Sequence, residues 1–302
     1  MKINYIIYLS LILGFQACNS SKNIPENEDT LSKTILDETE NSSAFIRDAT
    51  NAINQLILED KHTPFEKIKH DKIENHEVNS GVDIMYALAD KKTGNEMYHH
   101  LQKSTLYIGI SYLCGKCPNV HLSAATGFVI HEDGIVVTNY HVITPQEGLQ
   151  HFGVFAVSHE GVVYNVTEVL SSSKANDLAI LKIDTQGAKL DALPLAKTEL
   201  VGEGVYMMGH PFQNTFLMTK GIISRKYEGS KKIPRITITA EFGNGASGGP
   251  VVNEYGQVIG IVSSTRSHYT NGSNPKNKGD LQLTLNIVVP VSQLNKYVKL
   301  IK

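Results

Sequence analysis

The sequence of 302 residues contains no tryptophan, and only 7% of its residues are aromatic. Few side chains are therefore available on which the bases of a single-stranded nucleic acid could stack. A surplus of positive charge is absent too, because 28 basic and 30 acidic residues give a net charge of -2. Non-specific nucleic-acid binding depends on basic residues that displace counterions from the phosphates. The composition argues against a nucleic-acid partner.

Cysteine and long apolar runs are also scarce. Three cysteines are too few for a disulfide scaffold. The longest apolar stretch, residues 3–13, is shorter than the roughly 20 residues that cross a bilayer. Hydrophobic residues still make up 41% of the chain, which is enough for a sizeable core. We expect a globular protein with one large domain or two smaller ones, and no transmembrane helix after processing.

The N-terminus has the features of an export signal. Lys2 precedes the apolar stretch, and the small residue Ala17 stands directly before Cys18. A basic start, an apolar stretch and a small residue describe a secretory signal peptide. The Ala-Cys junction resembles the lipobox of bacterial lipoproteins, although Phe15 stands where leucine is usual. We predict a signal peptide over residues 1–17, a lipid anchor on Cys18 and a periplasm-facing place in the bacterial cell envelope; the alternative is an ordinary signal peptide with an incidental cysteine.

Behind this signal the composition changes twice. Residues 18–43 are polar and predict a solvated tether. Residues 44–94 predict a small helical extension, because apolar positions recur at helical spacing in its first part, residues 44–58. We assign residues 95–302 to the main domain.

The main domain has the texture of an all-β fold. About eleven short runs rich in Val, Ile, Tyr and Thr alternate with Gly, Asn, Asp and Pro, and the last of them is residues 258–262. Such a pattern favours a barrel or a sandwich of short strands. Residues 291–301 predict a terminal helix, with apolar side chains at Leu294, Val298 and Ile301.

A glycine-rich segment, residues 243–250, places Ser247 in a tight turn between two predicted strands. Gly245 permits a backbone in which the N–H groups of Gly245 and Ser247 point into one small pocket. Such a pocket stabilises the oxyanion of an acyl-transfer intermediate by about 3–4 kcal/mol per donor. A serine becomes a nucleophile only when a base takes its proton.

Two other positions supply that base and its partner. His141 follows a predicted strand and the residues Thr-Asn-Tyr, and Asp177 stands directly before an apolar strand. A carboxylate at a strand edge can hydrogen-bond an imidazole, fix its tautomer and stabilise the imidazolium. Taken singly, each residue has a plain interpretation: a buried structural histidine, a turn aspartate and an idle serine.

In the order His141, Asp177, Ser247, these motifs resemble the trypsin-like serine peptidases, and most closely the HtrA (Deg) branch. The resemblance covers about residues 95–300 and is carried by six segments: residues 127–128 (GF), 138–142 (TNYHV), 177–182 (DLAILK), 209–212 (GHPF), 221–224 (GIIS) and 245–250 (GASGGP). It implies two six-stranded antiparallel β-barrels of the chymotrypsin type. It also implies a triad of His141, Asp177 and Ser247, an oxyanion hole at Gly245 and Ser247, polypeptide substrates, and neither a cofactor nor a metal ion.

The sequence also departs from that branch. Ala246 stands where an Asn or Asp is usual, a position that contributes backbone. We expect no counterpart of that branch's PDZ domain within the 302 residues, so activation through such a domain is not implied. The resemblance implies that Glu241, six residues before Ser247, lies at the floor of the specificity pocket. It also implies that Ser263 and Ser264 line the wall of that pocket. An acidic floor would favour Lys or Arg before the scissile bond, whereas a solvent-facing glutamate would not.

Cys114 and Cys117 form a CxxC segment in a loop. In an exported protein this segment predicts a local disulfide. A zinc site with His121 as third ligand is the alternative, although a fourth ligand is not evident. The overall prediction is a serine endopeptidase that acts on envelope proteins. Its alternatives are a catalytically silent, protease-like binding protein and a disulfide- or zinc-based protein with an incidental serine.

Overall fold

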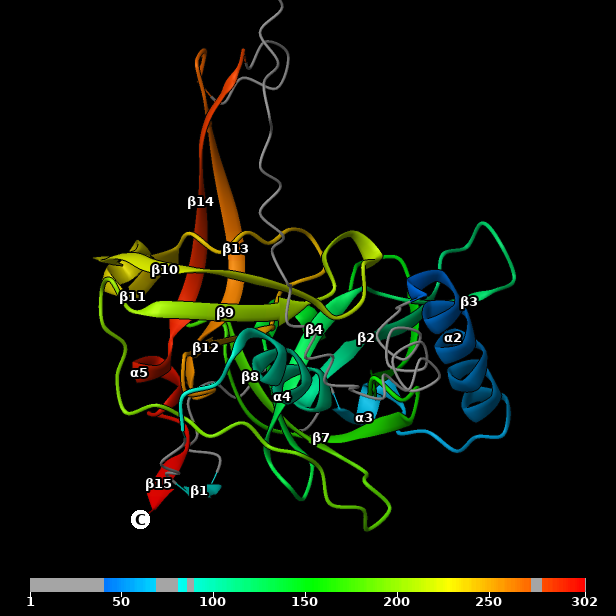
Figure 1. Ribbon diagram of the computed structural model, residues 1–302. Coiled ribbons are helices and arrows are strands. Elements are labelled where there is room, and N and C mark those ends of the chain that lie inside the picture. The colour runs from blue at the N-terminus through cyan, green and yellow to red at the C-terminus, as the bar shows by residue number, and fades with distance from the viewer. Residues whose placement is uncertain (1–40, 69–80, 86–89, 273–278, 302) are drawn as a thin grey trace, which may run out of the picture. The chain divides into compact units, whose positions relative to one another are not determined.

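Figure 1 shows the computed structural model of the chain, which describes residues 41–68, 81–85, 90–272 and 279–301. The predicted signal peptide, the lipid attachment at Cys18 and almost all of the predicted tether lie outside the described residues. In the part of the chain that is described, no helix combines the length and the apolar character needed to cross a membrane.

The described chain forms two closed, six-stranded antiparallel β-barrels, which confirms the predicted fold class. The first barrel runs in the order β2-β4-β5-β8-β7-β6 and closes by pairing β6 with β2, while the short β3 also pairs with β2. The second runs in the order β10-β11-β14-β13-β12-β9. The six strands of the first barrel are β2 Thr105–Leu113, β4 Ala125–His131, β5 Ile135–Thr138, β6 Gln150–Val157, β7 Val163–Ser173 and β8 Leu178–Ile183. The additional strand β3 is Val120–Leu122. Those of the second are β9 Gly204–Gly209, β10 Leu217–Glu228, β11 Pro234–Ile238, β12 Pro250–Asn253, β13 Val258–Tyr269 and β14 Leu281–Pro290.

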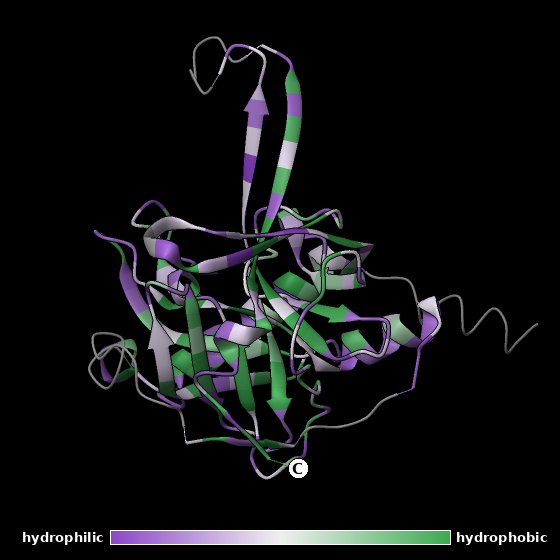
Figure 2. Cartoon of the chain, turned by 90° about the vertical axis from the view of Figure 1, so that its left-hand side faces the viewer, coloured by the Kyte–Doolittle hydropathy of each residue, from purple (hydrophilic) through white to green (hydrophobic). Residues whose placement is uncertain are grey.

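Strands β4, β5 and β8 are almost wholly apolar because both of their faces are buried. Successive side chains of a strand point to opposite faces. Val129 and Val136 therefore join the interior of the first barrel, whereas Phe128 and Val137 join a core that includes the second barrel. Figure 2 shows hydrophobic residues concentrated on strands in the body of the molecule. A continuous apolar run is what this double burial requires.

The longest hairpin, β13–β14, begins in the second barrel and continues beyond it, at the top of Figure 1. Its inner part is buried, while its outer part exposes apolar side chains such as Leu281 and Leu283. Strand β14 is absent from the eleven predicted runs. Its outer half alternates apolar with polar residues and faces solvent on both sides, so it does not resemble a core strand.

Helix α2 (Ser42–Leu58) confirms the helix predicted over residues 44–58. Asn41 caps it by accepting the N–H of Ala44 at 3.1 Å. Near its start, the ring of Phe45 lies 6.0 Å from that of Tyr107 and 5.5 Å from that of Phe216. Helix α2 thus contacts both barrels. The other N-terminal elements are α3 Phe65–Ile68, β1 Asp83–Met85 and α4 Gly94–Ser104.

The helix predicted over residues 291–301 is wrong beyond its first turn. The helical part, α5, is Val291–Leu294, and the chain then ends in strand β15, Lys299–Ile301. Strand β15 pairs in parallel with β1. Leu294 and Val298 are buried in the core as the apolar spacing indicates, but hydrogen-bond partners on β1 stabilise the last residues as a strand.

Candidate active site

Strand pairing brings His141 and Asp177 together. Thr138, the last residue of β5, pairs with Ala179 on β8. His141 lies in the 3-10 turn η2 (Tyr140–Ile143) just after β5, and Asp177 lies just before β8. The Nδ1 atom of His141 is 2.8 Å from Oδ1 of Asp177, and the backbone N–H of His141 donates to the same oxygen at 3.3 Å.

The carboxylate of Asp177 is held from two sides. Its side chain is only 20% exposed, and its second oxygen accepts the hydroxyl of Ser263 at 2.7 Å. Burial alone would raise the pKa of Asp177, but the hydrogen bonds from His141 and Ser263 hold it below its ordinary value. Asp177 has a φ of +56°, a conformation that Asp adopts more readily than most residues. It is therefore an ionised acceptor fixed against the imidazole.

Ser247 lies in the same cleft as His141. Both line a cavity of about 190 Å³ between the two barrels. Among the described residues, the hydroxyl of Ser247 donates to the carbonyl of Ser263 at 3.3 Å and not to His141. The structure thus joins histidine to aspartate directly and leaves the serine nearby, hydrogen-bonded to the strand behind it.

The turn before Ser247 has a fixed peptide orientation. The N–H of Phe212 donates to the carbonyl of Asn244 at 2.7 Å. Because a trans peptide directs its N–H away from its C=O, the N–H of Gly245 points to the opposite side. Gly245 has a φ of +100°, and a Cβ there would lie 2.4 Å from the carbonyl oxygen of His210. Only glycine fits this position.

Thr126, which no sequence motif indicates, anchors both ends of this turn. Its hydroxyl donates to the carbonyl of Gly245 at 2.8 Å, and its N–H donates to the carbonyl of Ser247 at 2.9 Å. The hydroxyl also accepts the N–H of His210 at 3.2 Å. Among the described residues, the N–H groups of Gly245 and Ser247 have no protein acceptor. Both remain available to a substrate oxygen.

His210 supports the turn from behind as a neutral side chain. It is fully buried, and burial lowers its pKa to about 3. Its Nδ1 accepts the N–H of Phe216 at 3.0 Å, and its ring packs against Tyr107. Its position in the 209–212 motif was visible in the sequence, whereas this supporting contact depends on tertiary packing.

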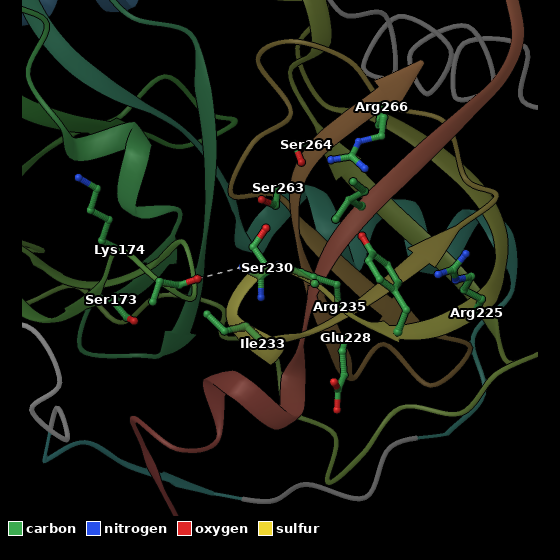
Figure 3. A pocket seen from close by; sticks show the side chains of 14 residues that line it. Ser173, Lys174, Arg225, Glu228, Ser230, Ile233, Arg235, Ser263, Ser264 and Arg266 are labelled. Atoms are coloured by element: carbon green, nitrogen blue, oxygen red, sulfur yellow. Dashed lines mark hydrogen bonds between the residues drawn. The ribbon is translucent and has the colours of Figure 1, made fainter. Parts of the chain in front are cut away.

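The predicted pocket residues are placed differently from one another. Glu241 is exposed, and its backbone carbonyl accepts the hydroxyl of Thr219. Ser263 and Ser264 instead line a cavity of about 970 Å³, shown in Figure 3, whose lining does not include Glu241. The structure therefore separates the predicted floor from the predicted wall.

Cys114 and Cys117 are free thiols whose sulfur atoms are 3.5 Å apart, whereas a disulfide requires about 2.05 Å. The predicted disulfide is not formed in this structure. Nε2 of His121 lies 3.1 Å from the sulfur of Cys117. The three residues could offer a metal three ligands, one fewer than zinc usually takes. The pKa of the Cys114 thiol is lowered to about 6, chiefly by a hydrogen bond from the backbone of Lys116.

Residues 125–261 match the family described as the trypsin-like peptidase domain. The matched stretch contains His141, Asp177 and Ser247. The two-barrel fold and this match show that residues 125–261 are similar to a serine-type peptidase domain of the trypsin-like class.

Relatives described as proteases match stretches of similar length. The chain is 38% identical over 152 residues to Serine protease HTR4 of Bos taurus, covering 47% of this chain and 30% of that protein. It is 32% identical to the chloroplastic Protease Do-like 5 of Arabidopsis thaliana, covering 49% of this chain and 50% of that protein. It is 30% identical to a probable periplasmic serine endoprotease DegP-like of Hahella chejuensis, covering 50% of this chain and 32% of that protein. The chain spans half or less of each of these three proteins.

Proposed function

We propose that the chain is a serine endopeptidase in which Ser247 is the nucleophile, His141 the base and Asp177 the residue that orients the base. The 2.8 Å contact between Nδ1 of His141 and Asp177, at the edge of the cleft that contains Ser247, carries this proposal. Because Asp177 accepts the Nδ1 proton, Nε2 of a neutral His141 has a lone pair free to receive a proton.

The mechanism follows from these positions. The hydroxyl of Ser247 turns from Ser263 towards Nε2 of His141, gives up its proton and attacks the peptide carbonyl. The N–H groups of Gly245 and Ser247 hold the oxyanion that forms. His141 then protonates the leaving amine, and water hydrolyses the resulting ester with His141 again acting as base. Asp177 stabilises the imidazolium in both steps.

Labelling with a fluorophosphonate probe tests the proposal, because the probe reacts with an activated serine. We expect labelling of residues 19–302 that is lost in Ser247→Ala and His141→Ala. Ser267→Ala and His268→Ala are matched controls on the projecting hairpin, where Thr284 is the residue that the described chain pairs with Ser267. A folded wild-type protein that takes up no probe would contradict the proposal and favour a catalytically silent binding protein.

We further propose that the substrates are polypeptides of the bacterial cell envelope and that a lipid on Cys18 anchors the chain there. The residue pattern before Cys18 supports the anchor, and the similarity to a protein described as periplasmic supports the location. In a bacterial host, the full chain should sediment with membranes and be released by detergent. Cys18→Ser should move to the soluble exported fraction, whereas Cys114→Ser should not. Equal membrane association of Cys18→Ser and wild type would contradict the anchor.

A further inference from the structure

The cavity beside Ser263 and Ser264 is lined by an unusual concentration of arginine. The chain has four arginines, and three of them line this one cavity: Arg225, Arg235 and Arg266. Figure 3 shows them around the cavity, with Lys174 on the opposite side. Lys174 belongs to the first barrel and the arginines to the second, so the cavity lies where the two barrels meet.

These cations outnumber the carboxylates near them. Among the described residues, none of the four forms an ion pair with a carboxylate. Arg235 donates to the backbone carbonyls of Ala175 and Asn176, and Arg225 stacks over the ring of Tyr227 at 4.6 Å. Glu228 is the one carboxylate in the lining. The lining therefore carries four cations and one carboxylate, and the carboxylate of Asp177 also attracts Arg235.

The cavity begins next to the proposed nucleophile. The carbonyl of Ser263 accepts a hydrogen bond from the hydroxyl of Ser247, and Ser263 is also one of the residues that line the cavity. The pairing of β13 with β12 ends at Ile261, so an extended peptide can lie along the edge of β13 that follows. Arg266 is three residues beyond Ser263, which corresponds to about 10 Å at the rise of a strand.

We propose that this cavity binds an acidic side chain of the polypeptide substrate, two to four residues from the bond that is cleaved. The inference rests on the proposed endopeptidase function. The guanidinium group presents paired N–H donors in a plane that matches a carboxylate, which a lysine-rich surface would not do. Arg235 is largely engaged by backbone carbonyls, so Arg225 and Arg266 are the groups free to meet the substrate.

Quenched-fluorescence peptides with one cleavage site test this inference. Each peptide carries Asp, Asn or Lys at one position, scanned from four residues before the cleaved bond to four after it. We expect kcat/KM at one or two positions to be about tenfold higher for Asp than for Asn, as a charged hydrogen bond provides. The preference should shrink in 1 M salt, where charges are strongly screened.

Variants decide whether the arginines are responsible. Arg225→Gln and Arg266→Gln should each reduce the Asp-to-Asn ratio of kcat/KM, and Arg266→Glu should reduce it further than Arg266→Gln. Arg47→Gln is the matched control, because Arg47 is the fourth arginine and lies on helix α2, paired with Asp48. Equal rates for Asp and Asn at every position, in wild-type protein that takes up the fluorophosphonate probe, would overturn this inference alone. Absence of probe labelling would instead overturn the proposed function.

Discussion

At the scale of single residues, Thr126 is the most informative side chain in the site. It hydrogen-bonds the carbonyl of Gly245 and the N–H of His210 with one hydroxyl. Thr126→Val keeps the shape and removes both bonds, which leaves two backbone groups without partners. We expect a loss of about 1–3 kcal/mol in the free energy of unfolding, measured in urea, and a fall in probe labelling. Thr126→Ser retains the hydroxyl and should restore the labelling rate; failure to do so would mean that the methyl group matters more.

The lowered pKa of Asp177 should make the free energy of unfolding depend on pH. Its pKa is lowered in the folded protein, so its contribution is complete above the unfolded value of about 3.9 and is lost as pH falls through the lower folded value. The difference in unfolding free energy between wild type and Asp177→Asn should therefore shrink between pH 6 and pH 3. Turnover by Asp177→Asn should fall on the order of 10⁴-fold at neutral pH. A stability difference that stays constant with pH would contradict the ionised, hydrogen-bonded state.

Cys114 should be the more reactive of the two thiols. Its pKa is lowered to about 6, so at pH 7 most of it is the nucleophilic thiolate. Alkylation by iodoacetamide, followed by peptide mass spectrometry of the reduced protein, should rise through about pH 6 for Cys114. The curve should move to higher pH in Cys117→Ala, because this variant removes the Cys117 thiol, which is one of the hydrogen-bond partners. A midpoint near pH 8.5 in wild type would contradict this prediction.

At the scale of elements, the turn before Ser247 depends on backbone shape. Gly245→Ala would place a Cβ 2.4 Å from the carbonyl oxygen of His210 in a positive-φ conformation. We expect the turn to shift and probe labelling to fall to background, at a cost of about 1–3 kcal/mol in stability. Gly161→Ala is the matched control, because Gly161 also has a positive φ but open space around the added Cβ. Normal labelling of Gly245→Ala would show that the turn tolerates another geometry.

The comparison of sequence with structure also differs from element to element. The apolar runs at residues 135–138 and 178–183 predict the bounds of strands β5 and β8 correctly, because both faces of these strands are buried. The apolar spacing predicts a helix at the position of strand β15. The chain forms a strand there because it pairs with β1, a segment far away in the sequence. The motifs predict His141, Asp177 and Ser247, which strand register and glycine turns then bring near one another. The role of Thr126 and the cluster of three arginines arise from the joining of distant strands, so no local pattern could indicate them.

At the scale of the whole molecule, helix α2 links the barrels through Phe45. The ring contacts Tyr107 beside the first barrel and Phe216 beside the second. Phe45→Ala should lower the free energy of unfolding by about 2–3 kcal/mol through lost burial and aromatic contact. Leu58→Ala is the control on the same helix, because Leu58 is 75% exposed. Equal stability of the two variants in chemical denaturation would show that α2 does not support the barrels.

The parallel pairing of β1 with β15 has a consequence for the timing of synthesis. Asp83 pairs with Lys299, so strand β1 cannot form this pairing until residue 299 has been synthesised. Helix α2 likewise waits for residues 215–216, which lie in the second barrel's half of the chain. Contacts between such distant segments slow folding, because a large loop must close before they form. The pairing of β1 with β15 can therefore form only after residues 299–301 have left the ribosome.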